Sequence, residues 1–403
     1  MVSDALKTLA NDIEGLLGID INKHDDWSIE TAAVHGYDAE DPLTGAITTP
    51  IYQAITFSHP AFEGTKGFGY TRTGNPTVLE LENTIALLEG GKKAFAMASG
   101  MAAITLVLKL FSAGDHIVVG DDMYGGTYML FDTIYSRYGL EFDYVDSSNT
   151  DELARAIKPN TKAIFVETPT NPTMKVVDIA AAAAIAHDAG ALLVVDNTLM
   201  TSYFQKPFEL GADLVVYSGS KYLCGHNDVM CGFVVVRDEE LIEPIYNGYK
   251  TEGATLPPFD CWLMQRSLKT LPLRLRAQQE NALAITAFLK EHPHVTDVLY
   301  VGDPEHPSYE LTCKQSSGFG GMISFRTDTY ERMQQVVERV RLITYAESLG
   351  GAESLITYPK VRTHSAMPEE LLARLGIDDR LLRLSVGFES ANDLIADLEQ
   401  ALA

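Results

Sequence analysis

Short apolar segments, rich in β-branched residues, alternate with helical patterns through the middle of the chain. The alanine-rich segment 178–190 predicts a helix that stops at Gly190, and LARAI (153–157) predicts another. Continuous apolar strands separated by helices are typical of a mostly parallel sheet covered on both faces, so we expect an α/β fold. Five segments predict its buried strands: HIVVG (116–120), AIFVET (163–168), ALLVVDN (191–197), LVVYSGS (214–220) and GFVVVRD (232–238).

Different patterns precede and follow this region. Asn75 and Pro76 predict the start of a helix, after an extended arm that includes residues 44–57. Beyond residue 270 the pattern predicts a small α+β domain with strands at 321–327, 342–348 and 381–387 and helices at 274–290, 328–341 and 391–402. We therefore divide the chain into an N-terminal extension and arm (1–73), a large domain (74–270) and a C-terminal small domain (271–403).

The charge and cysteine content restrict the partners and the compartment. The 403 residues include 31 basic and 55 acidic ones, and the net charge of −24 repels nucleic acids and anionic membrane surfaces. No apolar run reaches the roughly 20 residues that span a bilayer. Residues 1–20 are acidic where a signal peptide is basic, and they predict a short helix. The cysteines form no C-x-x-C pair, which is typical of a reduced cytoplasmic protein: Cys224, Cys231, Cys261 and Cys313.

Lys221 follows the predicted strand 214–220, and ligands bind at the carboxyl ends of parallel strands. Ser218 and Ser220 flank this lysine and can donate hydrogen bonds to a phosphate. Asp196 ends another predicted strand. A carboxylate there can pair with the protonated nitrogen of a pyridine ring in a cofactor, and this pairing keeps the pyridine ring able to accept electrons. A lone lysine here is more often a surface residue and a lone aspartate more often closes a turn, so the inference depends on their combination.

The segment 96–108 predicts a strand that runs into a helix. Ser99 is placed near its N-cap, and Gly100 lets the backbone approach a ligand, so the first helical turn offers N–H groups to an anion. The segment has neither a Walker A lysine nor G-x-G-x-x-G, which argues against nucleotide binding. Tyr124, followed by two glycines, can lie flat on a planar cofactor, although a tyrosine in a plain glycine turn is an equal alternative.

Eight motifs occur together along the chain: YTRTGNPT (70–77), ASGMAA (98–103), YGGT (124–127), FVETPTNPT (165–173), VVDNT (194–198), SGSKY (218–222), ESLGGAESL (347–355) and LRLSVGFE (382–389). With these motifs the chain resembles the Cys/Met-metabolism family of pyridoxal-phosphate (PLP) enzymes over about residues 28–403. That family includes cystathionine γ-synthase, cystathionine γ-lyase, cystathionine β-lyase and methionine γ-lyase. The resemblance implies a type-I PLP-dependent transferase fold, like that of aspartate aminotransferase, with a large mostly parallel-sheet domain and a small C-terminal α+β domain.

The resemblance also implies roles for the candidate residues. Lys221 holds PLP as a Schiff base and then acts as the acid–base group, and Asp196 pairs with the pyridine nitrogen. Tyr124 stacks on the ring and, as a second catalytic residue, can relay a proton. The phosphate is held by residues of the same chain and two of the neighbouring subunit: Gly100, Met101, Ser218 and Ser220, then Tyr70 and Arg72. The substrate α-carboxylate is bound by Arg383, Asn171 and Ser348. Active sites shared in this way imply a homotetramer built as a dimer of dimers.

Within the family, the sequence favours γ-elimination from L-cystathionine, which yields cysteine, 2-oxobutyrate and ammonia. Glu347 is placed to receive the distal ammonium group of cystathionine, although it can instead cap a strand end. Gly126 stands where methionine γ-lyases have cysteine, so methionine is a poor candidate substrate. The alternatives are a cystathionine γ-synthase, a cystathionine β-lyase and, remotely, a PLP-fold protein that only binds.

The remaining polar residues receive simpler interpretations. His35, His59 and His226 show no metal-ligand spacing, so we expect no metal, and His364 is expected to order its loop. Arg383 has the alternative of an ion pair with Glu389, and Cys224 can line the pocket near Lys221.

Overall fold

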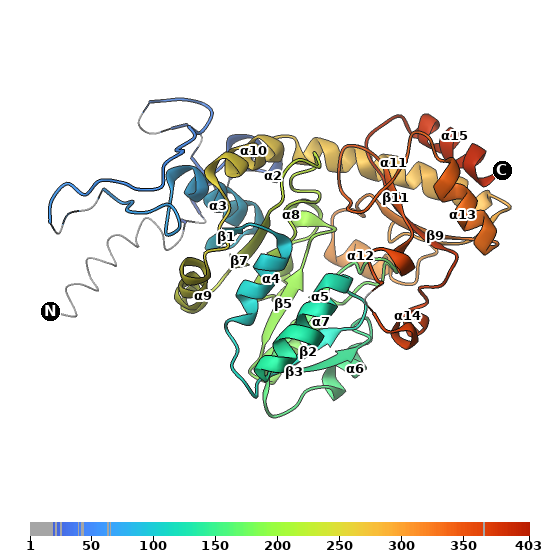
Figure 1. The fold of residues 1–403 in the computed structure, drawn as a ribbon, viewed down its shortest axis with the longest axis horizontal. Helices are drawn as coiled ribbons and strands as arrows, with labels where there is room; N and C mark the ends of the chain where they lie inside the picture. The colour runs from blue at the N-terminus through green and yellow to red at the C-terminus, as the bar shows by residue number, and fades with distance from the viewer. Residues whose placement is uncertain are drawn as a thin grey trace. The chain divides into compact units, whose positions relative to one another are not determined.

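The computed structural model describes residues 19–20, 22–24, 26–38, 40–41, 44–62, 64, 66–365 and 367–403, and Figure 1 shows its fold. The acidic helix expected over residues 1–20 lies outside the described residues except at its last two positions. The chain divides into two compact units. Unit 1 comprises the described part of 1–110 with 216–220 and 228–270, and unit 2 comprises 111–215, 221–227 and 271–403.

Unit 1 packs helices onto a pair of antiparallel strands, β1 (Lys93–Met97) and β7 (Gly232–Val236), which are buried throughout. Its helices are α2 (Ile29–His35), α3 (Pro76–Glu89), α4 (Gly100–Leu108), α9 (Glu239–Glu252) and α10 (Pro258–Leu268). Asn75 caps α3 by accepting the N–H of Thr77, so the predicted helix start is confirmed. Helix α3 packs on β1 and α4 packs on β7, which gives the strands their apolar cover.

The first part of unit 2 is a parallel α/β array. Its strands are β2 (His116–Gly120), β3 (Glu141–Val145), β4 (Thr161–Glu167) and β5 (Leu192–Asp196). Its helices are α5 (Gly125–Met129), α6 (Thr150–Arg155), α7 (Ile179–Asp188) and α8 (Thr201–Phe204), with the π-helix η1 (Leu130–Ile134) and the short 3₁₀ helices η2 (Tyr135–Tyr138) and η3 (Pro207–Leu210). Asp178 caps α7, and Gly190 follows its end with a φ of +67°, as the sequence predicts.

Strand β6 (Leu214–Tyr217) completes a seven-stranded sheet with the order β1-β7-β6-β5-β4-β2-β3. The predicted α/β class with the type-I PLP-enzyme fold is confirmed. Strands β2 to β5 are parallel as expected, whereas β1 and β7 run antiparallel, so the sheet as a whole is mixed.

The C-terminal part of unit 2 is built on a five-stranded sheet with the order β10-β11-β12-β9-β8. The strands are β8 (Val295–Leu299), β9 (Met322–Thr327), β10 (Thr344–Tyr345), β11 (Leu355–Thr357) and β12 (Leu381–Ser385). The helices are α11 (Leu271–Glu291), α12 (Tyr309–Gln315), α13 (Tyr330–Arg339), α14 (Glu369–Leu375) and α15 (Ala391–Leu402), with the turn η4 (Pro359–Val361). Helices α11, α13 and α15 bury one apolar core with this sheet, which is the predicted small α+β arrangement.

The strand predicted over residues 342–348 is wrong except at Thr344 and Tyr345. The N–H groups of residues 341–343 donate to the carboxylate of Asp397, so the start of the segment has side-chain partners in place of a strand ladder. At the other end, Ser348 adopts a φ of +78°, which leaves the extended conformation.

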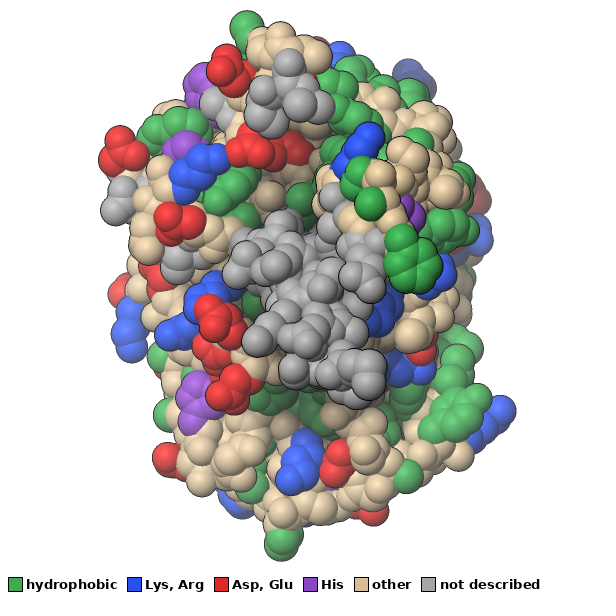
Figure 2. Space-filling model, turned by 90° about the vertical axis from the view of Figure 1, so that its left-hand side faces the viewer, with side chains coloured by type: hydrophobic (Ala, Val, Ile, Leu, Met, Phe, Trp, Pro, Cys, Tyr) green, Lys and Arg blue, Asp and Glu red, His purple; other side chains and the backbone are tan. Residues whose placement is uncertain are grey.

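The surface shown in Figure 2 carries acidic and basic side chains interspersed with one another. Among the described residues, none of the helices has the length and apolar character that a bilayer crossing requires. In the same part of the chain, no three His, Cys, Asp or Glu side chains are grouped so that they could hold a metal ion.

Candidate active site

Lys221 lies in unit 2, directly after the segment that follows β6. Its Nζ donates a hydrogen bond to Ser348 Oγ at 2.8 Å. Burial lowers the pKa of Lys221 to about 8, and the positive charge of Arg383 acts in the same direction. A neutral amine is the form that attacks a carbonyl carbon, so this lysine is prepared for covalent attachment of an aldehyde near neutral pH.

Arg383 lies on β12 and is only 2% exposed. Its Nη1 donates to Asn171 Oδ1 at 2.9 Å, and its Nη2 donates to the carbonyl oxygen of Ser348 at 2.7 Å. Burial lowers the pKa of Arg383 to about 10, so the side chain remains a cation at pH 7. Its buried Nε has no hydrogen-bond partner among the described residues. A buried cationic donor of this kind is suited to a carboxylate ligand.

The sequence left open an ion pair between Arg383 and Glu389, and the structure gives Glu389 other partners. Its carboxylate accepts hydrogen bonds from the N–H and the hydroxyl of Ser354 at 2.6 and 2.9 Å. Arg383 is therefore directed toward Asn171 and Ser348, in agreement with the grouping expected from the sequence.

Ser348 connects the lysine and the arginine, because its side chain contacts Lys221 and its backbone carbonyl contacts Arg383. A φ of +78° is uncommon for serine and needs support from tertiary contacts. Gly350 supplies part of that support, since a Cβ at this position would lie 2.6 Å from the backbone nitrogen of Tyr222. The close approach holds the 348–350 segment against the residue after Lys221.

Asp196 ends β5, and Thr198 donates to its Oδ1 through its N–H at 3.0 Å and its hydroxyl at 2.6 Å. Burial nevertheless raises the pKa of Asp196 to about 6. A buried carboxylate gains most from a nearby cation, and a protonated pyridine nitrogen is one. The residue thus has the charge and the strand-end position predicted for it.

Glu167 is a residue that the sequence reasoning missed. It ends β4 directly opposite Asp196 in the parallel register of β4 and β5. Burial raises the pKa of Glu167 well above its ordinary value, and the charges of Asp196 and Asp122 raise it further. The sequence contained a signal for Glu167, because this residue ends the predicted strand AIFVE. Asp196 was singled out for the same reason, its position at the end of a predicted strand.

Tyr124 depends on Glu167 for its position. Its backbone N–H donates to Glu167 Oε2 at 3.2 Å, and the residue forms the N-cap of α5. The side chain is 43% exposed, so the ring remains accessible to a ligand. This is the arrangement that a stacking role for Tyr124 needs.

His364 orders the loop next to Asn171. Its Nε2 donates to the carbonyl oxygen of Asn171 at 3.0 Å, which leaves Nδ1 to accept the hydroxyl of Thr363 at 2.8 Å. Burial, aided by the charge of Arg383, lowers the pKa of His364 to about 4, so the ring is neutral at pH 7. These contacts are those of the loop-ordering residue that the sequence predicts.

Unit 1 contains the residues predicted to hold a phosphate. Ser99 caps α4 by accepting the N–H of Ala102 at 3.1 Å. Gly100 begins that helix against Ser218, because a Cβ on Gly100 would lie 2.8 Å from Ser218 Cβ. The hydroxyl of Ser220 accepts the N–H of Cys231 at 2.8 Å. The structure thus brings Gly100 and Ser218 together at a helix N-terminus, where oxyanions bind.

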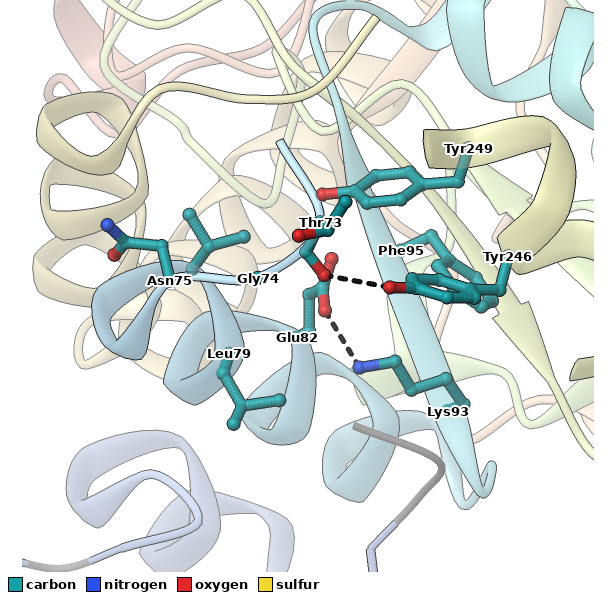
Figure 3. Close-up of a pocket in the computed structure, with 10 residues that line it drawn as sticks. Thr73, Gly74, Asn75, Leu79, Glu82, Lys93, Phe95, Tyr246 and Tyr249 are labelled. Carbon is teal, nitrogen blue, oxygen red and sulfur yellow. Dashed lines mark hydrogen bonds and ion pairs between the residues drawn. The ribbon is translucent and has the colours of Figure 1, made fainter. Parts of the chain in front are cut away.

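Tyr70 and Arg72 lie on the arm of unit 1, which is fixed by contacts within that unit. The guanidinium carbon of Arg72 lies 5.4 Å from the centre of the Tyr70 ring, and Arg72 Nη1 donates to the carbonyl oxygen of Lys250. In Figure 3, the hydroxyl of Tyr246 points to the carbonyl oxygen of Thr73 and donates to it at 3.1 Å. The reach of Arg72 to a neighbouring subunit stays a prediction.

The same close-up shows a buried ion pair beside the arm, between Lys93 Nζ and Glu82 Oε2 at 2.8 Å. Together with Thr73, Phe95 and nearby residues, the pair lines a cavity of about 10 Å³.

Glu347 is 64% exposed at its side chain and precedes Ser348. Arg362, which the sequence analysis did not single out, lies near it, with Nη1 at 3.8 Å from Glu347 Oε1. Nothing in its own segment, PKVRTH, marked this arginine, because the proximity arises only from tertiary structure.

The residues fit PLP by their chemistry. Lys221 offers an amine of lowered pKa to an aldehyde, and Asp196 offers a buried carboxylate to a pyridinium. Gly100 begins α4 in close contact with Ser218, so the free N–H groups of the first helical turn lie beside a hydroxyl that can also bind a phosphate, and Arg383 keeps a buried donor for the carboxylate of an amino acid. No part of this set conflicts with the cofactor.

Comparison with known proteins identifies the same chemistry. The family model described as "Cys/Met metabolism PLP-dependent enzyme" matches residues 30–403. The cystathionine gamma-lyase of Bacillus subtilis is 47% identical over 93% of this chain and 98% of its own length, and a cystathionine beta-lyase of Lactococcus lactis is 48% identical over 93% and 99%. The structure of cystathionine gamma synthase from Xanthomonas oryzae in complex with cystathionine is 42% identical, with a TM-score of 0.91 over 93% of this chain and 98% of that one.

Proposed function

Because the chain belongs to the Cys/Met metabolism PLP-dependent enzyme family, we propose that it cleaves L-cystathionine by γ-elimination, with cysteine, 2-oxobutyrate and ammonia as products. PLP is its cofactor, as the sequence predicted, and its substrates belong to sulfur amino-acid metabolism. The observation that carries the proposal is the convergence of Lys221 and Arg383 on Ser348. An amine that moves protons lies there beside an anchor for the substrate carboxylate.

When bound, PLP supplies an electron-accepting ring that stabilises negative charge at the substrate α-carbon. Asp196 would pair with the pyridine nitrogen, and Tyr124 would stack on the ring. Gly100, Met101, Ser218 and Ser220 would hold the phosphate, with Tyr70 and Arg72 from a neighbouring subunit. These assignments are supported by the strand-end position of Asp196, by the exposure of Tyr124 and by the position of Gly100 at the start of α4, beside Ser218.

Arg383, supported by Asn171, binds the α-carboxylate and so fixes the position of the reacting Cα. Lys221 Nζ then removes the proton from Cα, while Ser348 Oγ holds this nitrogen in place. Because γ-elimination also requires a proton to leave Cβ, the same amine must reach two neighbouring carbons, and its pKa of about 8 suits repeated uptake and release of a proton. Glu347 receives the distal ammonium group.

Product analysis with L-cystathionine tests the reaction. We expect the purified enzyme to form cysteine and 2-oxobutyrate in equal amounts, measured by chromatography and a 2-oxo-acid assay. Homocysteine and pyruvate as main products would show β-elimination and refute the proposal.

The first alternative is cystathionine synthesis by γ-replacement. It is supported by the likeness to a γ-synthase structure, which shares the fold at a TM-score of 0.91. Incubation with an O-acyl-L-homoserine and cysteine distinguishes the two, because a synthase forms cystathionine faster than it degrades it.

We further propose a cytoplasmic homotetramer in which Arg72 acts across a subunit boundary. The role of Arg72 is supported by its exposure on the arm beside Tyr70, where a second subunit can contact it. Mixed tetramers of Arg72→Ala and Lys221→Ala subunits contain some sites with both groups intact and should regain activity. If subunit exchange is demonstrated and no activity returns, Arg72 does not act in trans.

A further inference from the structure

Two oppositely charged side chains, Glu347 and Arg362, come from the two segments of unit 2 that also carry substrate-anchoring contacts. Glu347 directly precedes Ser348, which contacts both Lys221 and Arg383. Arg362 lies two positions before His364, which donates to the carbonyl oxygen of Asn171. Both charges are therefore tied through short stretches of chain to the residues that hold the reacting end of a substrate.

Arg362 is held from one side in a fixed orientation. Its Nε donates to the hydroxyl of Tyr345 at 3.2 Å, and its guanidinium carbon lies 5.5 Å from the centre of the Tyr345 ring. This hydrogen bond uses Nε, and the terminal nitrogen Nη1 lies on the side of Glu347, 3.8 Å from Oε1.

The pair with Glu347 is too loose to be explained as a stabilising salt bridge. Nη1 and Oε1 are 3.8 Å apart, beyond the range of a hydrogen bond, and the two side chains are 50% and 64% exposed. An exposed pair of this kind contributes between zero and about 1 kcal/mol to stability. Both groups keep the capacity to bond a ligand that lies between them or across them.

We propose that Arg362 and Glu347 together determine specificity for substrates whose distal end is itself an α-amino acid. The distal carboxylate binds the terminal nitrogens of Arg362, and the distal ammonium group binds Glu347. This inference rests on the proposed function and deepens it, because it adds Arg362 to the residues that recognise the distal end of the substrate. Arg362 is a specificity residue in this scheme and takes no part in proton transfer.

The chemistry explains why one charge is insufficient. The distal end of such a substrate carries an ammonium and a carboxylate on the same carbon, so Glu347 alone would attract one group and repel the other. A guanidinium matches a carboxylate with two parallel hydrogen bonds, which a lysine or an apolar residue cannot reproduce. With a chain charge of −24, a carboxylate at this position needs a local cation.

The test compares two substrates of the same length in the Arg362→Met variant. L-cystathionine carries the distal amino acid, and S-propyl-L-homocysteine has the same thioether without the two distal charges. Loss of a charge-assisted hydrogen bond at a half-exposed site should raise KM for L-cystathionine about tenfold with kcat nearly unchanged. KM for S-propyl-L-homocysteine should stay within about twofold of the wild-type value.

Arg380→Met is the matched control, since Arg380 is also partly exposed but pairs with Asp378, and it should change neither KM. Arg362→Lys should recover part of the loss, because it restores the charge without the planar fork. Equal KM changes for both substrates, or no change for either, would refute the proposal that Arg362 and Glu347 recognise the distal end of the substrate.

Failure of the proposed function is detected separately with the wild type, which would then form pyruvate from L-cystathionine or would mainly synthesise cystathionine. If the wild type does not turn L-cystathionine over, its binding to the wild type and to Arg362→Met is measured by calorimetry. An affinity for L-cystathionine that is about tenfold lower in Arg362→Met supports the proposed role of Arg362, and equal affinities refute that role.

Discussion

Glu80 and Glu82 lie on the same helix, α3, and both are buried, yet we expect opposite results when each is replaced by glutamine. Glu80 Oε1 accepts the N–H groups of Tyr37 and Asp38, each at 3.1 Å. Glu82 instead forms an ion pair with Lys93, which is itself buried. The first glutamate lacks a cationic partner in these contacts, and the second has one.

Burial raises the pKa of Glu80 from its ordinary value of 4.5 to about 7, and the charge of Asp38 contributes to the rise. Between these pH values the folded state binds more protons than the unfolded state, so the free energy of unfolding falls as pH rises. At roughly 1.4 kcal/mol per tenfold change in proton affinity, the loss reaches about 3 kcal/mol above pH 8. Glutamine keeps the acceptor without the charge, so Glu80→Gln should be more stable than the wild type at pH 8.5 by up to about this amount, and by only about 1 kcal/mol at pH 5.

Glu82→Gln leaves the Lys93 ammonium buried without its partner, which costs about 3–5 kcal/mol at both pH values. Thermal unfolding of the PLP-loaded protein, followed by tryptophan fluorescence, measures both variants. Trp27 and Trp262 are the two tryptophans of the chain and both belong to unit 1, as do the two glutamates. A lower midpoint for Glu80→Gln at pH 8.5, or the same gain at pH 5 and pH 8.5, would refute the reasoning.

Three further predictions concern the site in unit 2. Lys221→Ala should abolish turnover of L-cystathionine while the circular dichroism spectrum stays that of the wild type, and retained activity would contradict the role of this lysine. Glu167→Ala removes the acceptor for the N–H of Tyr124 and should weaken PLP binding about tenfold in equilibrium dialysis, whereas Glu167→Gln should stay within about threefold. Equal losses in the two variants would show that the charge of Glu167 matters more than its hydrogen bond. Asn171→Ala removes a hydrogen bond to a buried cation and should raise KM about tenfold with kcat nearly unchanged, and a fall in kcat alone would argue against a role in substrate binding.

Features that depend on neighbouring residues were predictable from the sequence. Asn75 caps its helix, and the apolar strands around Asp196 form where expected, because capping and burial act over a few residues. Strand β3 was missed because Glu141 and Asp143 interrupt its apolar pattern, as an edge strand allows. The contacts of Glu167 and Arg362 could not be predicted without the fold, because their partners belong to other segments of the chain.

The family motifs identified most of the candidate residues but not their mutual contacts. The sequence indicated Asn171, Ser348 and Arg383 as one group, and the structure joins them by hydrogen bonds. It did not indicate that Ser348 also holds Lys221, since that contact requires the backbone of residue 348 to leave the strand pattern with a φ of +78°.

The double use of Ser348 has a practical consequence for redesign of the enzyme. The hydroxyl of Ser348 holds the amine, and its backbone carbonyl holds the carboxylate anchor at a φ of +78°. A bulky or β-branched residue at position 348 therefore removes the first contact and strains the backbone that makes the second. Glu347 and Arg362 carry neither of these contacts and are exposed. A library that varies 347 and 362 and keeps 348 unchanged can therefore explore new leaving groups while the proton-transfer machinery stays intact.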